Sequence, residues 1–149
     1  MESQVSAIDR VQRIEAIIAA HVLREGPLLP ILHDVQALFG WIDDDAKRQI
    51  AQALNLSRAD VQGVISFYHD FRQHAEPRPV LKLCRAEACQ ARGVEALVAG
   101  ARAVAGERVA IETIYCLGLC AIGPAALVGQ AVHARLDADR LAALIGAMV

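Results

Sequence analysis

The chain has 149 residues, which is enough for one ordinary domain or for a small domain with a helical appendage. Hydrophobic residues make up 55% of the sequence, so a packed core is expected and general disorder is excluded. The net charge of −2 gives no reason to expect nucleic acid or a membrane surface as a partner.

The first 74 residues are expected to form a small bundle of four amphipathic helices. Ser6 and Asp9 have the spacing of an approximate capping box and begin the first helix, which ends at Gly26-Pro27. Pro30 suits the first turn of a second helix, which stops at Gly40.

The third and fourth helices have acidic start signals. The run 43–45 places three aspartates at the start of a helix that extends to about Leu54. Ser57 and Asp60 repeat the capping-box spacing, and the helix that they begin is predicted to end near Phe71.

The polar, proline-containing run 73–79 is typical of a boundary between domains. Residues 80–149 are then expected to form a second domain whose order is strand, helix, strand, hairpin and helix. Its elements are predicted at 80–83, 94–105, 108–115, 126–128 and 131–134, with Asp137 capping a last helix. The fold class is therefore α/β (α+β), with a helical bundle before a mixed four-stranded sheet.

The four cysteines of the chain lie in two short loops, each directly after a predicted strand. Cys84 and Cys89 follow the first strand, and Cys116 and Cys120 follow the second. A strand–helix–strand unit favours parallel strands, whose carboxyl ends lie at one edge of a sheet. The sequence therefore predicts a four-thiolate site at that edge.

Spacing alone leaves the occupant of this site open. A [2Fe–2S] centre, a structural zinc ion, and unligated or disulfide-bonded cysteines are the alternatives. Zinc sites favour closer C-x2-C pairs, and a thioredoxin-type dithiol would also need C-x-x-C. Gly118 would let backbone N–H groups approach sulfur, as in iron–sulfur centres. The five histidines lie away from both loops, which disfavours a histidine-ligated centre.

Three aromatic residues, Phe67, Tyr68 and Phe71, allow two interpretations. They belong to the core of the bundle, which is favoured for Phe67, or they form part of a docking face.

Other function classes are disfavoured. The chain has no serine–histidine–acid set, phosphate-binding loop or dinucleotide fingerprint, so catalytic residues of its own are not expected. No secretory signal or membrane-length apolar run is visible, which indicates a cytoplasmic protein without direct membrane insertion. Disulfides are rare in that reducing compartment.

The cysteine pattern, Cys84-x4-Cys89 with Cys116-Leu-Gly-Leu-Cys120, resembles the thioredoxin-like [2Fe–2S] ferredoxins. It is most similar to the 24 kDa-type subunit of respiratory complex I and its relatives in NAD-dependent hydrogenases and formate dehydrogenases. The first half agrees, because four runs are similar to helices and turns of that family: 29–36, 39–42, 54–61 and 64–71. The resemblance implies a thioredoxin-like domain at 80–149 after a helical bundle at 1–74, one [2Fe–2S] cluster, and Cys84, Cys89, Cys116 and Cys120 as its iron ligands.

Within that family, the run Cys84-Arg-Ala-Glu-Ala-Cys-Gln90 is most similar to the gamma subunit of soluble NAD-dependent formate dehydrogenases. One departure is Gly123, where relatives often have alanine. The implied role is an electron-transfer subunit that docks on a flavin-bearing, NAD-binding subunit. FMN, NAD and the molybdopterin that oxidises formate would then lie on partner subunits. The alternatives are a subunit of complex I or of an NAD-reducing hydrogenase and, in another class, a zinc-stabilised adaptor.

Overall fold

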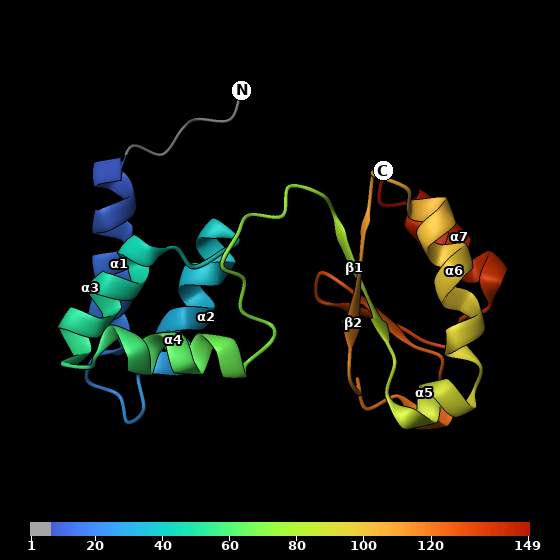
Figure 1. Ribbon diagram of the computed structural model, residues 1–149, viewed down its shortest axis with the longest axis horizontal. Coiled ribbons are helices and arrows are strands. Elements are labelled where there is room, and N and C mark those ends of the chain that lie inside the picture. The colour runs from blue at the N-terminus through green and yellow to red at the C-terminus, as the bar shows by residue number, and fades with distance from the viewer. Residues whose placement is uncertain (1–6) are drawn as a thin grey trace. The chain divides into compact units, whose positions relative to one another are not determined.

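The computed structural model describes residues 7–149, and the chain divides between Glu76 and Pro77 into two compact units (Figure 1). The first, here called the helical unit, contains α1 (Ala7–His21), α2 (Leu28–Phe39), α3 (Asp44–Leu54) and α4 (Arg58–Phe67). The second, the sheet unit, contains β1 (Val80–Cys84), α5 (Glu87–Ala91), α6 (Val94–Ala105), β2 (Ala110–Ile114), the 3-10 turn η1 (Cys120–Ile122), β3 (Ala126–Val128), β4 (Ala131–His133) and α7 (Ala138–Gly146).

The helical unit has its own apolar core. Each helix contributes residues spaced three and four apart, so that one stripe of each helix faces inward. The fully buried side chains are Ile14, Ile31, Leu32, Val35, Ile42, Ala46, Ile50 and Val61. The predicted start of the first helix at Ser6 lies outside the described residues.

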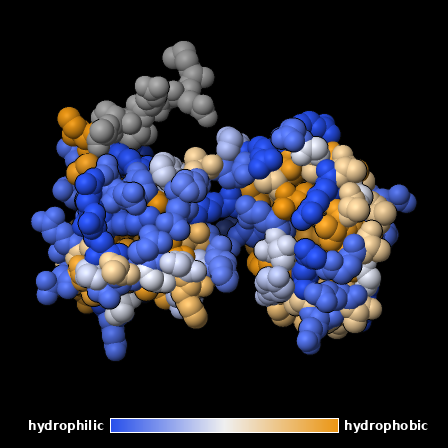
Figure 2. Space-filling model, in the orientation of Figure 1, coloured by the Kyte–Doolittle hydropathy of each residue, from blue (hydrophilic) through white to orange (hydrophobic). Residues whose placement is uncertain are grey.

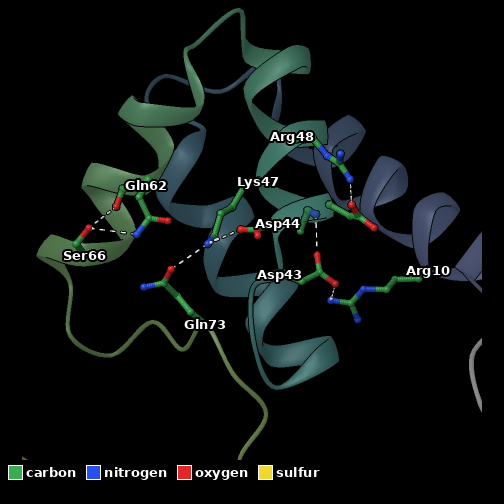
Figure 3. Close-up of polar contacts among 10 residues, drawn as sticks. Arg10, Asp43, Asp44, Lys47, Arg48, Gln62, Ser66 and Gln73 are labelled. Carbon is green, nitrogen blue, oxygen red and sulfur yellow. Dashed lines mark hydrogen bonds and ion pairs between the residues drawn. The ribbon is translucent and has the colours of Figure 1, made fainter.

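The predicted start signals of α3 and α4 are present as hydrogen bonds. Asp43 caps α3 by accepting from the Ala46 amide at 2.7 Å, and the Arg10 guanidinium pairs with the same carboxylate at 2.8 Å (Figure 3). Ser57 and Asp60 form the reciprocal capping box of α4. These bonds satisfy N–H groups that the first helical turn leaves without partners.

The segment after α4 is tied back to the helical unit. The Ile42 amide donates to the Arg72 carbonyl at 2.8 Å, and Gln36 Nε2 donates to the Asp70 carbonyl at 2.7 Å. Lys47 Nζ donates to Gln73 Oε1 at 2.9 Å from its place on α3 (Figure 3).

The predicted end of the fourth helix near Phe71 is wrong. Tyr68 has extended backbone angles of φ −90° and ψ 97°, so the helix ends at Phe67. The turn that follows directs Phe71 into the core, where it is 7% exposed. The expected core position of Phe67 is also wrong, because its side chain is 75% exposed.

The sheet unit has the strand order β2-β1-β3-β4. β1 is parallel to β2 and antiparallel to β3, and β3 is antiparallel to β4, which confirms the predicted mixed sheet. Side chains alternate along a strand, so Leu81 and Leu83 of β1 share one face. They pack in one core with Val94 and Ala101 of α6 and with Leu141 and Ile145 of α7.

Three details of the sheet unit differ from the prediction or add to it. The second strand is shorter than expected, since the regular pairing covers only Ala110–Ile114. The short helix α5, Glu87–Ala91, was not predicted. The peptide bond before Pro124, whose isomer the sequence leaves open, is cis.

Hydrophilic residues cover most of the helical unit on the face drawn in Figure 2, whereas apolar residues reach the surface of the sheet unit over a larger area. Within residues 7–149, none of the helices has the length and apolar character that crossing a membrane requires.

Because the two cores are separate, a cavity in one should weaken that unit alone. We expect Ile50→Ala, which empties a fully buried site in α3, to destabilise the helical unit by about 2–5 kcal/mol. Hydrogen exchange should then accelerate in α1–α4 and stay unchanged in β1, β3 and α7. Leu141→Ala should give the reverse pattern, and uniform acceleration in both variants would contradict separate cores.

Candidate metal centre

The carboxyl ends of β1 and β2 bring the two cysteine loops together. Cys84 is the last residue of β1 and lies opposite Ile114, the last residue of the parallel strand β2. Cys116 follows two residues later. The Arg85 amide donates to the Ile114 carbonyl at 2.9 Å, which joins the start of the first loop to the end of β2. Both loops therefore begin at the same edge of the sheet.

The four thiols lie in two pairs and form no disulfide. Cys84 and Cys89 share a hydrogen bond between their thiols. In the second loop, Cys116 Sγ lies 3.8 Å from Cys120 Sγ. The pairs are neighbours, since the backbone amides of Cys116 and Leu117 donate to the Cys84 sulfur.

The two pairs differ in their exposure to solvent. Cys84 is 2% exposed and Cys89 is 3% exposed, whereas Cys116 and Cys120 are exposed. The first pair belongs to the apolar core of the sheet unit, and Leu117 and Leu119 of the second loop pack against that core. One side of the site is therefore dry and the other side is open to solvent.

The surroundings change the acidity of the thiols in opposite directions. Burial raises the pKa of Cys84, but hydrogen bonds from the Ala86 amide, Cys89 and the second loop outweigh it, so the pKa is lowered. Burial, followed by the neighbouring Cys84, raises the pKa of Cys89. The Cys116 thiol raises the pKa of Cys120. Four thiolates this close together repel one another unless a cation lies among them.

The backbone of the second loop is shaped around its sulfurs. Cys116 has φ 67° and Gly118 has φ 74°, both in the left-handed region, which glycine adopts readily. This turn directs the Gly118 amide toward Cys116 Sγ at 3.4 Å. It is the approach of N–H to sulfur that Gly118 predicted, and such bonds tune iron–sulfur centres.

Helix α5 and Gly123 were underestimated from the sequence. Cys89 lies on α5, which contacts η1, the turn that begins with Cys120. A Cβ atom at position 123 would lie 3.0 Å from Cys89 Sγ and 3.3 Å from Arg92 Cδ. Glycine therefore permits the close approach of backbone to sulfur. The only sequence signal was its place directly after the second loop.

The donor set fits a centre that contains two metal ions. Two thiolates on one tetrahedral metal with bonds of ~2.3 Å are about 3.8 Å apart, which is the separation of Cys116 and Cys120. Among the described residues, no three His, Cys, Asp or Glu side chains converge as a group that could hold one metal ion. Two thiol pairs match two metal ions better than they match a single zinc ion.

Polar side chains around the first loop were also missed. Arg85 forms two hydrogen bonds with Glu95 of α6, at 2.8 and 2.6 Å, and Gln90 donates to the Arg85 carbonyl at 2.8 Å. Glu87 is exposed, as expected for a solvated residue. The spacing of Arg85 and Glu95 is not a helical one, so no local pattern indicated the pair.

Comparisons with known proteins agree with this geometry. The profile of the thioredoxin-like [2Fe-2S] ferredoxin family matches residues 14–149. The chain is 32% identical to an E-type NADH-quinone oxidoreductase subunit of Rhizobium meliloti, with 90% of this chain and 85% of that protein covered. It is 28% identical to NADP-reducing hydrogenase subunit HndA of Solidesulfovibrio fructosivorans, with 74% and 70% covered.

A solved structure has a similar fold. An NAD+-reducing [NiFe]-hydrogenase in the air-oxidized state matches with a TM-score of 0.68 and 28% identity over 81% of this chain. The match spans only 22% of the hydrogenase chain, so this chain corresponds to one part of that protein.

A mixed sheet with two cysteine loops at one edge defines a thioredoxin-like iron–sulfur protein. More particularly, the chain belongs to the thioredoxin-like [2Fe–2S] ferredoxin family, which confirms the resemblance found in the sequence. The expected cofactor, one [2Fe–2S] cluster, follows from this membership.

The difference in exposure predicts two classes of thiol. In the metal-free chain, we expect Cys116 and Cys120 to react rapidly with a disulfide reagent and Cys84 and Cys89 to react only slowly, because reagents do not reach buried sulfur. Peptide mapping of the modified sites would assign the classes, with circular dichroism as the check on folding. Equal rates at all four sites would contradict the described burial.

Proposed function

We propose that the four cysteines hold one [2Fe–2S] cluster, with Cys84 and Cys89 binding one iron and Cys116 and Cys120 binding the other. The observation that supports this most directly is the arrangement of the thiols as two pairs at one sheet edge. Four thiolates are the usual ligands of such a cluster, which supplies one-electron transfer when bound.

The chain's own residues have separate tasks in this proposal. The buried pair, Cys84 and Cys89, excludes water from one side of the site. The amides of Cys116, Leu117 and Gly118 donate to sulfur and stabilise negative charge there. The exposed pair leaves the other side open to an electron partner.

The chain then acts as an electron-transfer subunit of a multi-subunit, NAD-linked oxidoreductase. Relatives named as an NADH-quinone oxidoreductase subunit and an NADP-reducing hydrogenase subunit support this assignment. The partner that we propose is a flavin-bearing, NAD-binding subunit that carries FMN. Residues 1–74 and 80–149 serve in this complex as two domains, the first for docking and the second for electron transfer.

Within that class, we propose a cytoplasmic NAD-dependent formate dehydrogenase, in which a molybdopterin subunit oxidises formate. The similarity of the run 84–90 to the gamma subunit of those enzymes supports this assignment. The second candidate is a subunit of complex I or of an NAD-reducing hydrogenase, which the named relatives favour. A zinc-stabilised adaptor fits the paired thiols less well.

The surface of the second loop supports a permanently bound partner. Residues 113–134 contain no Asp, Glu, Lys or Arg, and Tyr115 within this run is 72% exposed. Partners that diffuse and collide are commonly steered by charge, whereas the buried centre of a stable interface is depleted of it. An uncharged rim beside an exposed thiol pair suits a subunit that stays bound.

The helical unit offers a further contact surface for the same partner. Phe67 is 75% exposed and Tyr68 is 42% exposed, and their rings form an edge-to-face pair. Tyr68 also lines a mainly apolar cavity of about 650 Å³ with Leu28, Leu56 and Val64. Exposed aromatic side chains are enriched at protein interfaces.

The ligand set predicts a coloured protein with equal amounts of iron and sulfide. We expect the purified chain to bleach on reduction by dithionite, and Cys84→Ala or Cys116→Ala to lose the cluster. Tyr115→Phe, in the same loop but without a ligand, should keep the spectrum. A colourless protein that contains zinc would contradict the proposed cluster.

The uncharged rim predicts that one added charge will block assembly. Ala121 is exposed on η1, so Ala121→Lys should keep the folded cluster but abolish co-purification with the flavin subunit, because an unpaired charge would be buried. The matched control is Ala99→Lys on the exposed side of α6, which should assemble normally.

The wild-type complex isolated in that experiment also tests the finer assignment. If the complex is a formate dehydrogenase, it should reduce NAD with formate. Activity with hydrogen or with quinone, and none with formate, would instead support the second candidate. Normal assembly of Ala121→Lys would contradict the proposed contact.

A further inference from the structure

The side chain of Arg85 connects the first cysteine loop to the neighbouring helix. Arg85 directly follows the ligand Cys84, and its guanidinium contacts Glu95 in the first turn of α6. Nε lies 2.8 Å from Glu95 Oε1, and a terminal nitrogen lies 2.6 Å from Oε2. This two-bond geometry holds both side chains more firmly than an ordinary surface ion pair.

The backbone of Arg85 is held at both of its polar groups. Its amide donates to the Ile114 carbonyl at the end of β2, at 2.9 Å. Its carbonyl accepts from Gln90 Nε2 at 2.8 Å, one residue beyond the ligand Cys89. A single residue therefore connects β2, α6 and both ends of the first cysteine loop.

The pair also places charge beside the site. Glu95 raises the pKa of Arg85, first through the hydrogen bonds and then through its charge, and Tyr115 contributes a smaller electrostatic effect. Tyr115 directly precedes the ligand Cys116, so the guanidinium is close to both loops. The two side chains are 32% and 46% exposed, which means that solvent weakens but does not remove their field.

We propose that Arg85 is a positioning residue for the cluster, and that the Arg85–Glu95 pair holds the first cysteine loop in place while keeping its local charge neutral. This inference rests on the proposed ligand set. Neither side chain binds iron. Both act through the geometry and the field that they impose on Cys84.

The charges predict opposite effects on the reduction potential. A [2Fe–2S] cluster with four thiolates carries a formal charge of about −2 when oxidised and about −3 when reduced. A nearby positive charge therefore favours the reduced form. Arg85→Gln leaves Glu95 unpaired and should lower the midpoint potential, whereas Glu95→Gln leaves Arg85 unpaired and should raise it.

The test measures the midpoint potential of the purified chain for both single variants and for Arg85→Gln/Glu95→Gln. The single variants should shift in opposite directions, and the double variant should return toward the wild type. The shifts should shrink as salt is added. Arg108→Gln is the matched control, because it makes the same charge change before β2, at the opposite edge of the sheet, and should leave the potential unchanged.

Hydrogen exchange of the metal-free chain tests positioning without the cluster. Amides 85–90 should exchange several-fold faster in the two single variants and in the double variant, and at the wild-type rate in Arg108→Gln. Unchanged exchange would overturn the positioning role. Shifts in one common direction, or no shift, would overturn the charge role. A wild-type chain that binds no iron would refute the proposed function instead, and exchange would still decide on the positioning.

Discussion

The site depends on the parallel pairing of β1 with β2. In that register Cys84 lies opposite Ile114, so the chain leaves both strands at the same edge and each cysteine loop begins there. An antiparallel pairing would place the loops at opposite edges of the sheet, and the four thiols could not share a metal centre. Helices α6 and α7 stabilise this arrangement by covering Leu81 and Leu83 on one face of the sheet. The fold therefore determines which thiols can meet, and the loops determine how they are oriented.

The contrast between the two thiol pairs connects structure to function. Cys84 and Cys89 lie in the apolar core, whereas Cys116 and Cys120 lie at the surface within a run of uncharged residues. Burial on one side protects a reduced centre from water, and exposure on the other gives a partner access to it. The amides around Gly118 and the Arg85–Glu95 pair then act on the same centre, the first through hydrogen bonds and the second through charge. A partner that covers the exposed side would complete the insulation of the site.

Much of this architecture could be predicted because its signals are local. Capping residues mark the starts of α3, α4 and α7, and apolar runs mark the strands that precede each cysteine loop. The features that were missed depend on contacts between distant segments. The end of α4 and the exposure of Phe67 follow from how the chain turns back toward α2, and the value of Gly123 depends on Cys89 coming within 3.0 Å of a Cβ there. Position along the chain contains no direct record of such approaches.

The central claim is that each cysteine pair holds one iron of a single cluster. Mössbauer spectroscopy of the protein loaded with ⁵⁷Fe tests it most directly, because the method reports on each iron separately. The account predicts two ferric sites in sulfur coordination, coupled to each other, and one site that changes when Cys120 is replaced by serine while the other keeps its wild-type signal. Equal changes at both sites would contradict the assignment of one iron to each cysteine pair, and the absence of iron would contradict the cluster itself.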